Sequence, residues 1–236
     1  MKKILVLSTD TYHHQYFVNK LLLEGVHIDG VIYETHSITP PFATGPVFED
    51  KEEAYDRENF FRDVPKEVPP SLISYVDRVN SRNSINLIKQ VRPDLGLVFG
   101  TGWISDEVIG QFKDGLLNIH RGIAQEYRGL ESDLWAIYHR DYSNIGVTVH
   151  KVESKLDAGG IVYQDRIKLH KGMKTHQLRY AWSVLGTELV LKAVKDYLKG
   201  ELKSYPQEKL GRYYSFMPLP LKKIVNARFN KYCEKL

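Results

Sequence analysis

Two polar residues separated by one position, Asn118 and His120, are the side chains best suited to do chemistry, and they close an apolar run that begins at Leu116. Side chains alternate along a strand, so these two project from the same face and place an amide donor beside an imidazole. A carboxylate on a neighbouring loop, such as Asp157, would orient that imidazole or hold its proton. An oxyanion donor, a titratable base and an acid suit acyl transfer without a covalent intermediate.

A second polar point follows the apolar run at 94–99, where the chain continues Thr101-Gly102-Trp103. Ligands of open α/β sheets bind beyond the carboxyl ends of the strands, which makes this turn a candidate binding segment. Each of these signals also has a structural interpretation. An Asn-x-His at a strand end is more often a satisfied polar pair, and Trp103 is equally well explained as a core aromatic residue.

The elements that must position these residues alternate between strands and helices. Apolar runs predict strands at 2–7, 28–33, 94–99, 116–120, 144–152 and 161–169. Helical spacing predicts helices at 12–23, 83–91 and 175–198, with shorter ones at 106–112 and 135–139. Continuous apolar strands separated by helices indicate an α/β fold with a mostly parallel central sheet. Residues 35–70 contain six prolines and an acidic run, and they are predicted to be a long surface loop, with a short helix as the alternative.

Composition excludes several classes of protein. The chain has 236 residues, 42% apolar and 26% charged, with a net charge of +4, so neither a disordered chain nor a strongly charged nucleic-acid or membrane binder is indicated. The basic excess is local, since residues 207–236 hold seven Lys or Arg and two Glu. The single cysteine, Cys233, cannot form an internal disulfide, and no apolar run approaches the roughly 20 residues of a membrane span. A reducing cytoplasm is therefore the expected location.

Five segments occur in an order that is more specific than any one of them. They are Leu117-Asn118-Ile119-His120, Tyr127-Arg128-Gly129, Trp135-Ala136-Ile137, the run from Gly146 to Val152, and the run from Asp157 to Gln164. Together they resemble the folate-dependent formyltransferase family over about a third of the chain. That family includes glycinamide ribonucleotide formyltransferase, methionyl-tRNA formyltransferase and the sugar N-formyltransferases.

The resemblance implies a Rossmann-like formyltransferase catalytic domain at 1–200, followed by a basic, aromatic C-terminal appendage at 201–236. It also implies 10-formyltetrahydrofolate as the formyl donor and requires no metal. The catalytic residues would be Asn118, His120 and Asp157, with Asn118 Nδ2 and His120 donating to the oxyanion. The donor would be held largely by main-chain groups of two segments, through Thr101, Gly102, Trp103, Ile104, Glu153 and Asp157.

The acceptor is expected to be a small amine near Arg121, Gly122 and Tyr127. Arg121 offers a planar charged fork that suits phosphate or carboxylate, although an ion pair with Glu126 or Glu131 explains it equally well. A tRNA enzyme of this family would carry a further C-terminal domain, and a formyltetrahydrofolate hydrolase a regulatory domain ahead of the first strand. A glycinamide ribonucleotide enzyme would have a glycine-rich turn where this chain has 8–15 without glycine.

These comparisons leave a nucleotide-linked amino sugar as the leading acceptor. The alternatives are another small amine, hydrolysis of the formyl donor, and a folate- or nucleotide-binding domain without catalysis. Neither a membrane nor a nucleic acid is expected as a partner, and a homodimer is left open.

Overall fold

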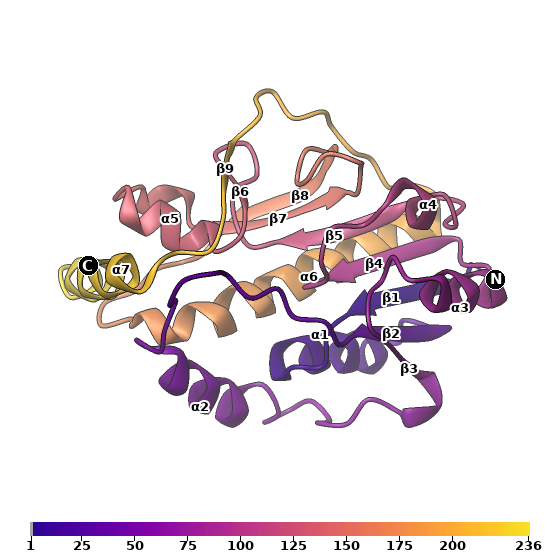
Figure 1. The fold of residues 1–236 in the computed structure, drawn as a ribbon, viewed down its shortest axis with the longest axis horizontal. Helices are drawn as coiled ribbons and strands as arrows, with labels where there is room; N and C mark the ends of the chain where they lie inside the picture. The colour runs from indigo at the N-terminus through magenta and orange to yellow at the C-terminus, as the bar shows by residue number, and fades with distance from the viewer. Residues whose placement is uncertain (1) are drawn as a thin grey trace.

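The computed structural model describes residues 2–236 and has a seven-stranded central sheet with the strand order β3-β2-β1-β4-β5-β7-β8 (Figure 1). Strands β1 to β5 are parallel to one another, while β7 runs antiparallel to both β5 and β8. This confirms the predicted α/β fold with a mostly parallel sheet. Two further short strands, β6 and β9, pair with each other in a separate parallel ladder.

The elements have the following bounds. The strands are β1 Ile4–Ser8, β2 Gly30–Glu34, β3 Ile73–Val76, β4 Leu95–Phe99, β5 Leu116–His120, β6 Tyr127–Gly129, β7 Gly146–Lys151, β8 Ile161–Arg166 and β9 Arg212–Tyr214. The helices are α1 Tyr12–Leu23, α2 Glu49–Asn59, α3 Arg82–Val91, α4 Asp106–Ile109, α5 Ser132–Tyr138, α6 Leu178–Lys199 and α7 Leu219–Cys233. Of the helices within residues 2–236, none is both long and apolar enough to cross a bilayer.

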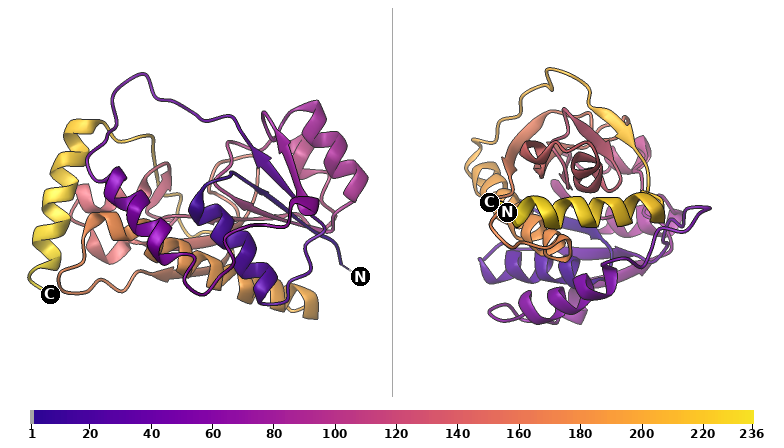
Figure 2. Two further views of the ribbon diagram at one scale, coloured as in Figure 1. Left: turned by 90° about the horizontal axis from the view of Figure 1, so that it is seen from below. Right: turned by 90° about the vertical axis from the view of Figure 1, so that its left-hand side faces the viewer.

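Alternation of side chains along the buried strands creates two separate cores, one on each face of the sheet. In β1, for example, Ile4 and Val6 belong to the core beneath α1 and α6, whereas Leu5 and Leu7 belong to the core beneath α3 and α4. Helix α6 runs along the sheet and contacts α1, β5, β7 and β8 (Figures 1 and 2). The two layers of helices hold the carboxyl ends of β1, β4 and β5 at one edge, where the candidate site lies.

The segment predicted to be a long loop contains more structure than its composition suggests. It includes helix α2, and a strand that the sequence did not predict, β3, follows it at the edge of the sheet. Helix α2 lacks an apolar face because its buried residues are Glu52 and Asp56, which pair with Arg179 of α6. Strand β3 is partly exposed for most of its length, so neither element has the apolar periodicity on which sequence interpretation depends.

The C-terminal residues pack into the core of the rest of the chain. Helix α7 lies against α5 at the end of the molecule opposite the N-terminus (Figure 2). Its Val225, Phe229 and Cys233, together with Met217, are fully buried in the same apolar cluster as residues of β1 and α1. Strand β9 pairs with β6, so the segment is joined to the fold by both a ladder and an apolar face.

Candidate active site

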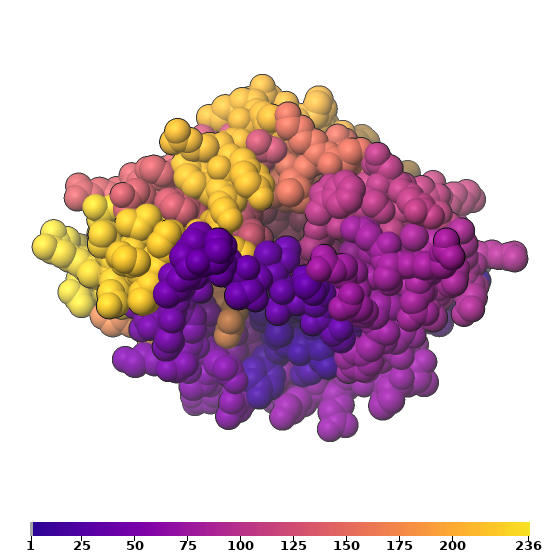
Figure 3. Space-filling view, viewed as in Figure 1, coloured from indigo at the N-terminus to yellow at the C-terminus, as the bar shows by residue number. Residues whose placement is uncertain are grey.

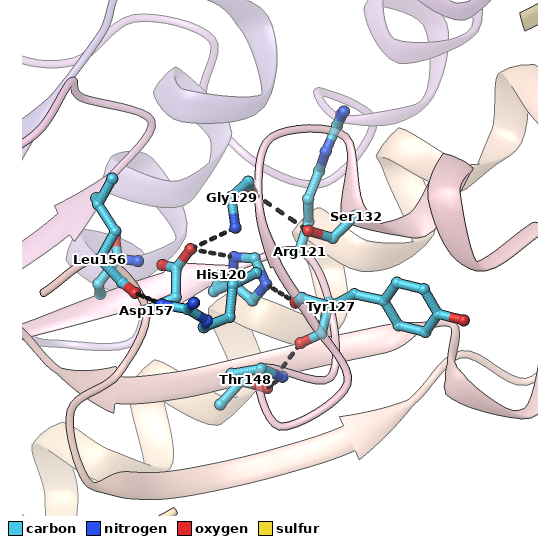
Figure 4. A network of polar contacts seen from close by, with 12 residues as sticks. His120, Arg121, Tyr127, Gly129, Ser132, Thr148, Leu156 and Asp157 are labelled. Atoms are coloured by element: carbon cyan, nitrogen blue, oxygen red, sulfur yellow. Dashed lines mark hydrogen bonds and ion pairs between the residues drawn. The ribbon is translucent and has the colours of Figure 1, made fainter. Parts of the chain in front are cut away.

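The structure brings His120 and Asp157 together at the carboxyl end of β5 (Figure 4), and Asn118 lies on the same strand. Asn118 and His120 lie on β5, and Asp157 lies in the loop that joins β7 to β8. His120 Nδ1 is 3.5 Å from Asp157 Oδ2. His150 of β7 lies directly across the ladder from Asn118, and its Nε2 is 3.3 Å from Asp157 Oδ1. One carboxylate therefore contacts two imidazoles, next to an amide.

The immediate contacts of His120 define its protonation. Nε2 lies 2.8 Å from the carbonyl oxygen of Tyr127, an acceptor, so this nitrogen carries a hydrogen and donates it. The nitrogen that can take a further proton is Nδ1, which faces Asp157. Burial lowers the pKa of His120 below its usual value, although the neighbouring Asp157 carboxylate works in the opposite direction. His120 is therefore neutral at pH 7 and is positioned to accept a proton.

Asp157 is ionised, and its loop is firmly held. Burial by itself would raise the pKa of Asp157, but His120, His150 and a 2.8 Å hydrogen bond from the backbone N–H of Gly129 together hold it well below the ordinary value. Its backbone adopts a left-handed conformation, with φ of 49°, which is uncommon outside glycine. Arg128 donates to the carbonyl oxygen of Leu156 and Gln207 donates to that of Asp157 itself. Such a conformation persists only where surrounding contacts enforce it.

His150 is the member of this cluster that sequence reasoning missed. Its Nδ1 lies 2.8 Å from the carbonyl oxygen of Lys151 and donates to it, which leaves Nε2 free to accept from Asn118 Nδ2 at 3.2 Å. The amide of Asn118 is thus oriented by a histidine from the adjacent strand and keeps a second N–H. The sequence predicted β7 as a strand but did not predict its pairing with β5. The antiparallel register of these two strands places His150 opposite Asn118.

These residues line a cavity of about 580 Å³, within the usual range for small-molecule sites. Figure 3 shows a depression on this face, between the yellow C-terminal segment and the magenta chain near residue 100. One half of the cavity is lined by the two predicted donor segments, through Thr101, Gly102, Trp103, Ile104, Glu153 and Asp157. Beyond His120 the lining includes His13, Arg121, Leu130, Glu131, Trp182, Tyr213 and Phe216, while Ile38 lies against Gly102 of the loop after β4.

The two donor segments meet through Trp103, which is 50% exposed and is therefore not a core residue. Its indole Nε1 donates to the carbonyl oxygen of Ser154, 3.2 Å away, and so joins the loop after β4 to the loop after β7. The indole forms part of the cavity wall. A half-exposed aromatic side chain beside glycine backbone is a surface on which a flat heterocycle can pack.

Two side chains that sequence reasoning missed hold the loop after β4: Glu34, the last residue of β2, and Asn80, which follows β3. Glu34 accepts hydrogen bonds from the backbone N–H groups of Gly102, at 2.8 Å, and Val79, at 2.9 Å. Asn80 donates to the carbonyl oxygen of Trp103 at 2.7 Å and accepts from the N–H of Ser105 at 2.9 Å. No sequence pattern predicts that Glu34, at the end of β2, binds the loop after β4, because the order of the strands in the sheet cannot be read from the sequence.

Arg121 lies in the half of the cavity beyond His120, and its side chain points away from the His120–Asp157 pair (Figure 4). The anticipated ion pair with Glu126 or Glu131 is not formed. The partner is Asp133, buried in α5, with 3.3 Å between Arg121 Nε and Asp133 Oδ1. The guanidinium also lies over the ring of Trp182, 5.5 Å from its centroid. Asp133 therefore balances the charge of Arg121. The remaining N–H groups of Arg121 stay at the cavity.

Gly122 and Tyr127, also predicted to bind the acceptor, do not line the cavity among the residues described. Both support His120 from behind. A Cβ atom at Gly122 would come within 2.6 Å of His120 Nε2, so only glycine leaves room for the ring. Tyr127 is buried; its carbonyl holds His120 and its hydroxyl donates to Asp141.

The two adjacent histidines after β1, His13 and His14, both line the cavity; His14 is buried, and its Nδ1 lies 2.7 Å from the hydroxyl oxygens of Thr9 and Thr11. Burial holds the pKa of His13 well below its usual value, so it is neutral. Within residues 2–236 no group of three or more His, Cys, Asp or Glu side chains is placed to bind a metal ion.

Fold and site define a Rossmann-like α/β protein with an acid–base cluster at the carboxyl edge of its sheet. The model of the formyl transferase family matches residues 42–194, and the chain belongs to that family. Among curated relatives, the methionyl-tRNA formyltransferase of Clostridium beijerinckii is 28% identical over 158 residues, which is 66% of this chain and 50% of that protein. The chain thus matches about half the length of this relative.

Two solved structures are similar in fold. A sugar N-formyltransferase from a Shewanella species has a TM-score of 0.65 at 14% identity, with 97% of this chain and 88% of that chain covered. HypX from Aquifex aeolicus, in complex with tetrahydrofolic acid, has a TM-score of 0.61 at 18% identity, with 96% of this chain and 34% of that chain covered. At these identities the similarity concerns the fold.

Proposed function

We propose that this protein transfers a formyl group from 10-formyltetrahydrofolate to the nitrogen of a small primary amine, with a nucleotide-linked amino sugar as the acceptor. The observation that carries the proposal is the convergence of Asn118, His120 and Asp157 in the middle of one cavity. Membership of the formyl transferase family supports the same chemistry.

The donor half of the cavity fits a flat heterocycle that hydrogen-bonds to main chain. The backbone N–H groups of Trp103 and Ile104 have no acceptor in the described part of the chain, and both residues line the cavity. The N–H of Gly102 and the carbonyl of Trp103 are already used by Glu34 and Asn80. Fewer main-chain groups are therefore available to the donor than the whole segment from Thr101 to Ile104 contains.

When bound, the folate donor supplies an electrophilic formyl carbon. The second N–H of Asn118, whose first is held by His150, is positioned to donate to the negative oxygen that develops as the amine attacks. One such donor typically lowers the barrier by about 3 kcal/mol. Neutral His120 takes the proton that the amine loses, at Nδ1, where ionised Asp157 stabilises it. The proton is then available to the departing folate nitrogen.

The charges in the cavity favour a small amine over an RNA acceptor. Apart from histidines, Arg121 is the only basic side chain among the described residues that line the cavity, and Asp133 balances it. Binding of a nucleic-acid backbone depends on several Lys and Arg contacts to phosphate. A nucleotide-linked sugar needs only its amine and ring inside, with the phosphates at the surface, where Arg121 or exposed basic residues can meet them.

The test is an assay of tetrahydrofolate release from 10-formyltetrahydrofolate by the purified full chain. The candidate acceptors are UDP- and dTDP-linked amino-deoxyhexoses, glycinamide ribonucleotide and methionyl-tRNA, with a sample without amine as the control. Release that depends on an amino sugar, together with a product 28 Da heavier, supports the proposal. Release without any amine indicates a hydrolase, dependence on methionyl-tRNA indicates the function of the curated relative, and binding without release indicates a non-catalytic domain.

A further inference from the structure

The loop that joins β7 to β8, residues 152–160, is bound through its carbonyl groups by a side chain from the C-terminal part of the chain. Gln207 Nε2 donates to the carbonyl oxygen of Asp157 at 2.8 Å and to that of Gly159 at 3.0 Å. In Figure 4 the carboxylate of Asp157 faces His120. Gln207 therefore holds the main chain of the loop, while the carboxylate of the same residue contacts the site.

The conformation of this loop requires such restraint. The left-handed φ of 49° at Asp157 costs roughly 1–3 kcal/mol for a residue other than glycine, and it persists only where other contacts enforce it. Residues 153–156, which lead into Asp157, are exposed and add little packing. The position of the Asp157 carboxylate therefore depends on hydrogen bonds to the loop more than on burial of its neighbours.

Gln207 is itself anchored on both sides. Before it, Tyr205 exchanges two backbone hydrogen bonds with Ile161, the first residue of β8, at 2.7 and 2.9 Å. After it, the backbone N–H of Glu208 donates to Gln125 Oε1 at 2.6 Å. The amide of Gln207 is thus a fixed point to which the loop is attached.

The chemistry of a primary amide matches this task. Its nitrogen carries two hydrogens, one for each carbonyl oxygen, and it adds no charge that would compete with the histidines for the Asp157 carboxylate. The reverse orientation of the amide would place Gln207 Oε1 against two acceptors, so the assignment of its nitrogen is fixed.

The oxygen of the same amide shows that this residue does more than fill space. Gln207 Oε1 is buried and has no hydrogen-bond partner among residues 2–236. A buried acceptor without a donor typically costs about 1–3 kcal/mol, and an apolar side chain of similar size would avoid that cost. The amide is therefore explained by its two N–H groups, which an apolar side chain lacks.

We propose that Gln207 is a positioning residue for formyl transfer, which holds the carbonyl groups of Asp157 and Gly159 and thereby aims the Asp157 carboxylate at His120. The inference rests on the proposed function and adds to it a residue outside 42–194, the range that the family model matches. Gln207 is not among the residues that line the cavity, so it acts through Asp157 and not on either ligand. Its role does not depend on which amine is the acceptor.

The test compares Gln207→Leu with Glu208→Leu, a matched control at the exposed next position. Four quantities are measured on the full chain: kcat with an amino-deoxyhexose nucleotide, the Kd for tetrahydrofolate, amide hydrogen exchange in 153–160, and the titration of His120 followed by NMR. We expect Q207L to accelerate this exchange and to lower kcat about tenfold or more, because a supporting group misplaced by about 1 Å can cost a hundredfold. The folate Kd should change less than about threefold, since Trp103 holds the Ser154 end of the loop independently. E208L should match the wild type.

The titration of His120 separates positioning from a merely structural role. The charged and titratable groups that face His120 are Asp157, which raises its pKa, and His150 and Arg121, which lower it. When Asp157 moves away in Q207L, the pKa of His120 should fall further below its usual value. A residue that only stabilises the fold would lower the melting temperature and leave this titration unchanged.

Gln207→Glu keeps the size of the side chain but presents oxygens to the two carbonyl groups, so it should impair kcat at least as much as Q207L. It also provides a second variant should Q207L fail to fold. A wild-type kcat in both variants, or a reduced kcat with unchanged exchange and an unchanged His120 titration, overturns the proposal. If the wild type formylates no amine, the proposed function fails, while the exchange and the titration still decide whether Gln207 positions Asp157.

Discussion

The two halves of the cavity are built in different ways. The donor half consists of loops that leave the ends of β4 and β7, and it is fixed by neutral and charged hydrogen bonds to backbone, from Glu34, Asn80 and Trp103. The acceptor half is assembled from segments separated by more than a hundred residues and fixed by buried ion pairs such as Lys222 with Glu49. The geometry of the donor half thus depends on the sheet, whereas that of the acceptor half depends on the tertiary packing of the C-terminal segment.

This difference indicates which half can change its ligand. Backbone groups at strand ends are determined by the fold and are insensitive to most substitutions, so the donor half is suited to a constant ligand. The acceptor half depends on a few side chains and on buried charges whose removal is costly, so single substitutions can alter it. The two halves should therefore differ in their response to substitution.

The largest effect is expected from removal of residues 210–236. This change exposes the apolar surface that Met217, Val225, Phe229 and Cys233 cover, and all four are fully buried. Burial of four such side chains contributes roughly 6–10 kcal/mol, which is comparable to the whole stability of a typical domain. We expect loss of a cooperative thermal transition. A truncated chain that unfolds cooperatively and binds tetrahydrofolate normally would show that the acceptor half is dispensable for the donor half.

A milder form of this test is Phe229→Ala, for which we expect a loss of about 3–5 kcal/mol in the free energy of unfolding. Lys231→Ala, on the exposed side of the same helix, serves as the control and should change it by less than about 0.5 kcal/mol. Urea titration of the two variants gives both values.

Substitution of the proposed acid–base pair, His120 and Asp157, should abolish the chemistry while the protein stays folded. Asp157→Asn and His120→Asn are each expected to lower formyl transfer by at least a hundredfold, the scale of lost general acid–base catalysis. Asp165→Asn, an exposed carboxylate on β8, is the matched control. Turnover close to wild type in either site variant, with an unchanged folate Kd, would remove the proposed mechanism.

Glu52 and Asp157 should contribute to stability with opposite dependence on pH. Burial raises the pKa of Glu52, behind the acceptor half, to about 7, so the native state binds more protons than the unfolded state between pH 4.5 and 7. Stability contributed by the protonated form is therefore lost as the pH rises through this window. The lowered pKa of Asp157 has the reverse sign, because its stabilisation is present above the ordinary aspartate pKa and is lost in acid.

Glu52→Gln removes the first effect. Relative to wild type, this variant should gain up to about 3 kcal/mol between pH 4.5 and 8, measured by urea unfolding at each pH. Glu53→Gln, on the exposed face of the same helix, should follow the wild-type curve. A difference between E52Q and wild type that does not vary with pH would contradict the raised pKa.

The sequence predicted the mostly parallel sheet from local apolar periodicity, and the structure places the predicted residues Asn118, His120 and Asp157 together, while their catalytic role stays a prediction. It favoured a loop over a short helix in the region of α2, because this helix buries Glu52 and Asp56 against Arg179 rather than apolar residues. The partners of these buried charges lie far away in the sequence, and the apolar periodicity of the chain does not predict them.

The same limitation explains the acceptor half. Arg121 was correctly singled out as a residue at the cavity, but its partner Asp133 could not be distinguished from Glu126 or Glu131 without the position of α5. His150 was part of a quoted motif, yet its contact with Asn118 depends on the register of β5 with β7. Sequence patterns identify candidate residues, while register and packing decide which of them meet.

The smallest and most selective effect is expected at Glu34, which acts only on the donor half. Glu34→Gln keeps one oxygen for either Val79 or Gly102 but turns an amide N–H toward the other donor, so one backbone hydrogen bond of the loop is lost. We expect the Kd for tetrahydrofolate to rise about tenfold, equivalent to about 1.4 kcal/mol, because the loop that presents Trp103 loosens. The acceptor KM at saturating donor should stay within twofold, and Asp77→Asn, a change at an exposed neighbouring carboxylate, should alter neither value. If E34Q raised the acceptor KM and left the folate Kd unchanged, the assignment of the two halves would be reversed, since the group that holds the loop after β4 would then be acting on the amine.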